Sequence, residues 1–216
     1  MLVLVLILAV GILVPLFLGS YYYSKNMGGC TKDQINTKTT PARFLITKEV
    51  TMESPAEMKS PIKMESQVAM EDSGCVVAYI LRYFGKQATG ADIYHSFREK
   101  LQNGGVAPKQ LVHYFVSAGY DAHLYEGTIA SLKQRVSEGV PVIVLLQEAL
   151  DTAKLHYAVV VGYDETYMYL MDSMNYLVNE SQPYYNRKIT YDEMRELWAV
   201  QFPYVINVYV TVKTRE

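Results

Sequence analysis

The sequence predicts an α+β fold, because its hydrophobic pattern changes part-way along the chain. In the first half of the patterned region, from about Gln67, most apolar residues recur at helical spacing. In the second half they form short β-branched runs of strand length. Nineteen tyrosines, many at alternating positions near the C-terminus, also suit a half-buried sheet. Helices followed by an antiparallel sheet define the α+β class.

The helical half is expected to contain four helices and one short strand. Residues 75–84 have apolar side chains at helical spacing, and Gly85 follows as a stop. Pro108 suits the first turn of a helix, and Thr128 can cap one. The remaining helices are expected at 91–101, 108–118 and 128–137, with a strand at YDAHLY.

The second half predicts a sheet with one more helix. GVPVIVLLQ is expected to be a buried strand, and HYAVVVGYD and YMYLMD form a hairpin that turns near residues 164–166. Thr190 and Glu193 have the spacing of a capping box for a helix that ends near Trp198. The stretch YVINVYVTV closes the chain as a strand.

Composition divides the chain into three expected segments. Residues 1–20 are expected to be a hydrophobic membrane anchor or signal segment, because 2–18 form an unbroken apolar run followed by tyrosines typical of membrane interfaces. No basic residue precedes the run, as it normally does in a secretory signal, so charge leaves its orientation open. Residues 21–61 are expected to be a polar tether that includes a candidate strand, RFLITKEV, and 62–216 form the folded domain.

Charge and cysteine content exclude several functions. The net charge is −2, and no basic block is interleaved with aromatic residues, so nucleic acid is not an expected partner. The two cysteines form no CxxC motif, and no His, Cys and carboxylate cluster has ligand spacing, so we expect no metal and no cofactor. Cys30 ends the string MGGC, which loosely resembles a lipoprotein acceptor site; an incidental linker cysteine is the favoured interpretation.

Cys75 is the candidate nucleophile. It stands at the start of a predicted helix, where free N–H groups and the helix dipole lower the pKa of a thiol. The preceding Asp72, Ser73 and Gly74 offer caps and a tight turn. Taken alone, a cysteine that leads an apolar helix is more often a core residue.

A possible base and its partner occur in the hairpin. Folding it about Asp164 pairs residues whose numbers sum to about 328, so His156 is expected opposite Asp172, with Cβ atoms about 5 Å apart. The carboxylate would then orient the imidazole. Gln67, eight residues before Cys75, is a candidate donor to an oxyanion. The other histidines, at 95, 113 and 123, are interpreted as surface or packing residues.

These elements, in this order, resemble the papain-like cysteine peptidases that process bacteriocin leader peptides (double-glycine leader peptidases), and especially their standalone branch. The resemblance rests on Gln67, DSGCVVAYILRYFG, GVPVIVLL and HYAVVVGYD followed by MD, over about residues 62–210. It implies a papain-like fold, with Cys75 as nucleophile, His156 as general base, Asp172 orienting the histidine and Gln67 in the oxyanion hole. In the transporter-fused relatives a glycine usually follows the cysteine, whereas here Gly74 precedes Cys75. That departure favours the standalone branch.

The function expected from the sequence is therefore a thiol hydrolase, most simply a peptidase that acts on a peptide or protein substrate through an acyl-enzyme. Two alternatives stay open: an inactive peptide- or leader-binding domain of the same fold, and an acyl transferase of transglutaminase type. The apolar segment predicts a membrane-anchored protein with its catalytic domain outside the cytoplasm, or a secreted one if the segment is cleaved.

Overall fold

The computed structural model describes residues 2–33, 62, 64–67, 71–140, 142–202 and 205–215, with side chains from residue 13 onward except that of Phe202. The helices in this part of the chain are α1 (Leu2–Asn26), α3 (Asp72–Tyr83), α4 (Gly90–Ser96), α5 (Pro108–Ser117), α6 (Ile129–Ser137) and α7 (Tyr191–Trp198). The strands are β1 (Thr31–Lys32), β2 (Tyr120–Glu126), β3 (Val142–Gln147), β4 (Leu155–Tyr163), β5 (Tyr167–Asp172), β6 (Arg187–Thr190), β7 (Gln201–Phe202), β8 (Val205–Ile206) and β9 (Val208–Thr214).

One large sheet organises the described residues. It has seven strands in the order β1-β2-β9-β3-β4-β5-β6, and a separate ribbon pairs β7 with β8. Every pairing in the large sheet is antiparallel except that of β1 with β2. The predicted architecture, helices first and an antiparallel sheet afterwards, is therefore present.

The helices cover the sheet and close the core. α3 packs on β4, α5 packs on β2 and β9, and α6 and α7 pack on the central strands. Buried aromatic residues such as Tyr79, Phe115 and Trp198 fill the space between the layers. Burial of side chains this large is the main favourable contribution to folding.

Local chemistry explains most element boundaries. Thr128 and Thr190 each accept a hydrogen bond from the third helical residue in a reciprocal capping box, as predicted for Thr190. Pro108 occupies the first turn of α5, where a missing N–H costs little. Gly119 follows α5 with φ +90°, a conformation that favours glycine.

Several predicted boundaries differ from the structure. α3 begins at Asp72, so Cys75 is its fourth residue and not its first. α4 ends at Ser96, whose hydroxyl donates to Ile93 O at 2.7 Å in a local bond that competes with helix continuation. The closing strand is divided at Asn207, which has φ +52°, and the short strand β6 was not predicted.

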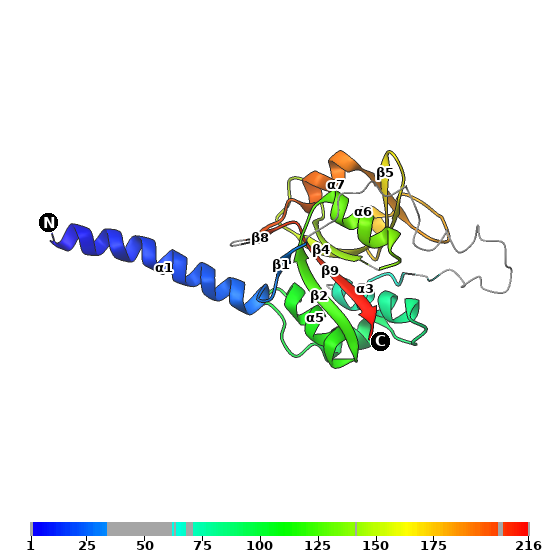
Figure 1. The fold of residues 1–216 in the computed structure, drawn as a ribbon, viewed down its shortest axis with the longest axis horizontal. Coiled ribbons are helices and arrows are strands. Elements are labelled where there is room, and N and C mark those ends of the chain that lie inside the picture. The colour runs from blue at the N-terminus through cyan, green and yellow to red at the C-terminus, as the bar shows by residue number, and fades with distance from the viewer. Residues whose placement is uncertain are drawn as a thin grey trace.

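The N-terminal part of the chain forms α1, which extends away from the rest of the molecule in Figure 1. Within the described residues, no helix is long and apolar enough to cross a membrane. The anchor role of residues 1–20 stays a prediction. Met27 is fully buried, and β1 pairs with β2, so this end of the predicted tether packs on the domain. The remainder of the tether, with RFLITKEV, lies outside the described residues.

Candidate active site

His156 and Asp172 form a buried pair at one end of the sheet. His156 is the second residue of β4, and Asp172 is the last residue of β5. The His156 Nε2 and Asp172 Oδ2 atoms are 2.9 Å apart, and both side chains are fully buried. The register places Asp172 opposite Ala158, two residues from the predicted partner, so the pair interacts diagonally across the hairpin.

This contact determines the tautomer of the neutral histidine. An ionised carboxylate only accepts hydrogen bonds, so Nε2 of His156 must carry the hydrogen and Nδ1 then holds a free lone pair. The Nδ1 atom is buried and has no hydrogen-bond partner among the described residues. The imidazole is therefore arranged to accept a proton at Nδ1.

Asp172 is held from several sides. Its Oδ1 accepts from Met174 N at 2.9 Å, and its Oδ2 accepts from Arg187 Nη1 at 2.8 Å. The Asn186 side chain bonds both the N–H and the carbonyl of Asp172, at 2.8 and 2.7 Å. Burial alone would raise the pKa of Asp172, but the bonds from His156 and Met174 and the charge of Arg187 outweigh it and lower the pKa. The carboxylate therefore stays ionised.

Sequence reasoning missed Asn186 and Arg187. Arg187 is the first residue of β6 and Asn186 directly precedes it; this strand of four residues lies inside a segment expected to be a polar loop. Arg187 is 5% exposed, and Nη1 is 3.4 Å from His156 Nε2. A buried arginine needs a carboxylate partner, but the sequence does not show which one.

The first turn of α3 is joined to β4 beside the histidine. Asp72 Oδ2 accepts from Tyr157 N, the residue after His156, at 2.7 Å. Burial raises the pKa of Asp72 to about 6, although the bond from Tyr157 and the nearby His156 act in the other direction. Asp72 was predicted as a cap, but the helix shows no side-chain cap and Asp72 serves as a tie between α3 and β4.

Cys75 faces a different neighbour. Its N–H donates to Glu71 O at 2.9 Å within the helix, and the residue is 2% exposed. A Cβ placed on Gly90, the first residue of α4, would lie 2.7 Å from Cys75 Sγ, so the sulfur packs against the start of α4. Burial, followed by the charges of Glu65 and Asp72, raises the pKa of the thiol to about 12. The thiol is thus neutral at physiological pH.

Gln67 lies beside the buried pair. Its N–H donates at 3.1 Å to the carbonyl of Ser173, the residue after Asp172. One atom of its side-chain amide, placed as Oε1, is buried without a hydrogen-bond partner among the described residues. Of the four residues predicted from the sequence, the structure thus brings His156, Asp172 and Gln67 to one end of the sheet, while Cys75 is turned toward α4.

The sequence from residue 59 to 199 matches the family model described as the Peptidase C39 like family. The chain belongs to this family. A comparison with curated proteins gives no match.

Solved structures agree on the fold of this C39-like chain. The peptidase domain of Streptococcus ComA, a bifunctional transporter of a quorum-sensing pathway, matches with a TM-score of 0.57 and 14% identity, covering 71% of this chain and 99% of that one. A C39-like peptidase of Bacillus anthracis matches at 0.53 with 12% identity, covering 72% and 96%. A double-glycine-motif protease of an AMS/PCAT transporter, bound to its leader peptide, matches at 0.51 with 17% identity, covering 73% and 93%. The predicted papain-like fold is therefore confirmed.

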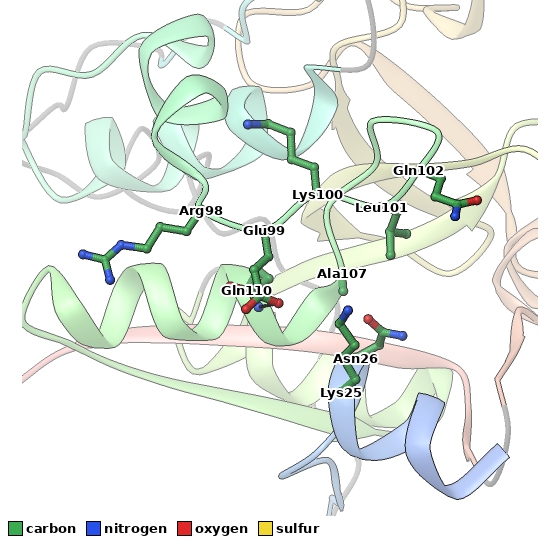
Figure 2. Close-up of a pocket in the computed structure, with 9 residues that line it drawn as sticks. All are labelled: Lys25, Asn26, Arg98, Glu99, Lys100, Leu101, Gln102, Ala107 and Gln110. Atoms are coloured by element: carbon green, nitrogen blue, oxygen red, sulfur yellow. Dashed lines mark hydrogen bonds between the residues drawn. The ribbon is translucent and has the colours of Figure 1, made fainter. Parts of the chain in front are cut away.

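Three cavities of the described residues lie near the helical half of this C39-like domain, and one of them, of 760 Å³, lies between the end of α1 and α5, away from the buried pair. The one drawn in Figure 2 has a volume of 410 Å³, is lined mostly by charged and polar residues, and contains none of the predicted site residues. The third has a volume of 580 Å³ and is lined by both Asp72 and Tyr157. Its remaining walls are largely apolar, with side chains that include Leu101, Val106, Ala107, Leu145 and Leu155. This apolar cavity therefore reaches Tyr157, the residue after His156, although neither His156 nor Asp172 lines it.

Among the described residues, no group of three or more His, Cys, Asp or Glu side chains could hold a metal ion.

Proposed function

We propose that this chain is a peptidase that cleaves peptide bonds through an acyl-enzyme, with His156 as the general base. The observation that carries the proposal is the buried His156–Asp172 pair, in which Nε2 is bonded to the carboxylate and Nδ1 is free. A base of this kind must be oriented, desolvated and able to accept a proton. Membership of the C39-like family supports the same reaction class.

The neighbouring groups supply the other requirements of acyl transfer. Asp172 holds the imidazole and stabilises the imidazolium formed when His156 takes a proton. Gln67 can donate an amide N–H to the oxyanion, since the O and N of an amide side chain can be exchanged by a flip. The nucleophile is expected in the first turn of α3, which Asp72 ties to Tyr157.

The proposed substrate is an extended peptide with an apolar residue near the scissile bond. The 580 Å³ cavity beside Asp72 and Tyr157 has mainly apolar walls and is large enough for one or two side chains. The related double-glycine-motif protease was solved with a leader peptide bound, which supports a peptide ligand here.

Digestion of a complex peptide mixture tests the proposal without a known substrate. The full-length protein is incubated with peptides from a cell lysate, and new peptide termini are counted by mass spectrometry. New termini should appear with the parent chain, with apolar residues enriched near the cut, and should disappear with His156→Ala. Equal cleavage by parent and His156→Ala would contradict the proposal, as would no cleavage by either. Product masses also distinguish hydrolysis from transfer to an added amine.

A second candidate is a peptide-binding domain without catalysis. The raised pKa of the Cys75 thiol, about 12, favours it over a thiol peptidase that uses this residue. In that case the same mixture would yield bound peptides with apolar residues but no new termini, and His156→Ala would leave binding unchanged.

A further inference from the structure

Three buried polar atoms without partners point to the same end of the sheet. They are Ser73 Oγ, His156 Nδ1 and an amide atom of Gln67, each without a hydrogen-bond partner among the described residues. Ser73 is fully buried. Buried polar atoms are nearly always bonded, so these three, together with Ser173 Oγ beside Asp172, need a partner that the described residues do not supply, such as water or a substrate.

Ser73 and Cys75 lie on different sides of the helix α3. Successive residues of an α-helix are about 100° apart, so these two side chains point about 200° apart. Gly74, between them, faces α4, because a Cβ there would lie 2.8 Å from Tyr94 N and would overlap the Gly90 carbonyl oxygen. Cys75 also contacts Gly90. Ser73 therefore points to the other side of the helix, away from α4.

On that other side, α3 packs against β4, which carries His156. Asp72 binds the N–H of Tyr157 at 2.7 Å, so the residue before Ser73 touches the residue after His156. In an unliganded site a nucleophile and its base need not be hydrogen-bonded, and the contact tightens when substrate arrives.

Building on the proposed function, we propose that Ser73, and not Cys75, is the nucleophile of this site. Oγ of Ser73 attacks the carbonyl carbon of the scissile peptide bond while its proton passes to His156 Nδ1. The C–N bond then breaks, and the leaving amine takes that proton, which leaves an ester on Ser73. Water attacks the ester, gives one proton to Nδ1, and releases the acid as Oγ regains the proton.

A fluorophosphonate probe, which reacts with activated serines, tests this assignment on the full-length chain. Peptide mapping should find the label on Ser73 in the parent. Labelling should fall at least tenfold in Ser73→Ala and His156→Ala and stay within twofold in Cys75→Ala, with circular dichroism used to verify folding. Equal labelling of parent and Ser73→Ala would overturn the assignment.

A variant with a cysteine at position 73 tests whether this position lies beside His156, without a serine probe. Ser73→Cys is introduced together with Cys75→Ala, and alkylation by iodoacetamide is followed against pH at each cysteine. A thiol at position 73 beside His156 should titrate below the ordinary value of roughly 8.5 and lose at least tenfold in rate at pH 6.5 when His156→Ala is added. Cys30 is the internal reference, since burial and Glu126 raise its pKa to about 11. A position-73 thiol with an ordinary titration would overturn the proposal.

These experiments separate the assignment from the proposed function. If peptides are cleaved by Ser73→Ala but not by Cys75→Ala, the peptidase function stands and the assignment to Ser73 is wrong. If neither the parent nor any variant cleaves peptides while the probe still labels Ser73 of the parent, the assignment stands and the peptidase function is wrong.

Discussion

At the scale of single residues, Asp172 gives the most direct prediction about catalysis. Asp172→Asn removes the charge that orients His156 and stabilises its protonated form, so kcat/KM on the peptides cleaved by the parent should fall by about 10³-fold. Asp192→Asn is the control, because that carboxylate is 90% exposed and pairs only with Arg195 among the ion pairs of the described chain. Loss of less than threefold for Asp172→Asn, with folding intact, would mean that Asp172 does not act on the base.

The raised pKa of Asp72 predicts that the free energy of unfolding depends on pH. Burial raises its pKa from 3.8 to about 6, so the folded state favours the neutral carboxyl. The stability that the neutral form provides is complete below about pH 4 and is lost as the pH rises through about 6. Asp72→Asn should therefore be more stable than the parent at pH 7, by up to about 3 kcal/mol, and similar to it at pH 3.5.

Denaturant unfolding of both chains at the two pH values measures this difference. A stability gap between parent and Asp72→Asn that does not change with pH would contradict the raised pKa of Asp72.

The sequence predicted the His156–Asp172 contact because strand alternation and a turn are local patterns. The predicted register was off by two: Ala158 and Asp172 sum to 330, not 328. The turn centres between Glu165 and Thr166, where paired numbers sum to 331, and the bulge between Val160 and Gly162 lowers the sum by one. Side chains two residues apart on one strand share a face, so the contact survived that error.

The choice of Cys75 depended on where the helix begins. Thiol chemistry drew attention to the cysteine, and a helix that starts at Cys75 would have placed it in the first turn. The helix starts at Asp72, which puts Ser73 in the first turn and Cys75 against α4. In the transporter-fused peptidases that the sequence resembles, a glycine usually follows the cysteine; here a glycine follows Ser73, which agrees with the proposal for Ser73.

At the scale of elements, the contact of α3 with α4 tests where Cys75 lies. Gly90→Ala would place a Cβ 2.7 Å from Cys75 Sγ and 3.1 Å from its backbone, so it should destabilise the fold by about 1–3 kcal/mol. In a Cys75→Ala background the sulfur is gone, and the cost of Gly90→Ala should shrink by about 0.5–1 kcal/mol.

The free energies of unfolding of parent, both single variants and the double variant complete this cycle. Strict additivity would show that the sulfur points elsewhere and would remove the main structural objection to Cys75 as nucleophile.

At the scale of the whole molecule, the order of the strands in the sheet could not be predicted from the sequence. The C-terminal strand β9 lies between β2 and β3 and so joins the helical half to the hairpin. Local patterns predict strands but not which strands pair across the chain, because such pairings depend on tertiary packing. The seven-strand order therefore became visible only in the structure.

The segment after α1 is a second feature that composition concealed. Residues 26–33 look like a polar tether, yet the Asp33 carboxylate binds both the Arg135 guanidinium and the Tyr209 hydroxyl, with Arg135 Nε at 3.2 Å. The side chain of Asp33 is 3% exposed and that of Arg135 is 18% exposed. The pair therefore fastens the N-terminal segment to α6 and β9.

Asp33→Ala should lower the stability of the whole domain. It leaves the Arg135 guanidinium with only the more distant Glu138 carboxylate, at 3.5 Å, whereas loss of one partner from a fully buried pair costs about 3–5 kcal/mol. Because Arg135 keeps Glu138 and some contact with water, we expect about 2 kcal/mol. Asp192→Ala, which breaks an exposed pair with Arg195, should cost about 0.5 kcal/mol or less. Denaturant unfolding of the three chains decides the point: equal stabilities for the two variants would mean that the segment around Asp33 is a tether after all and that the domain begins later in the chain.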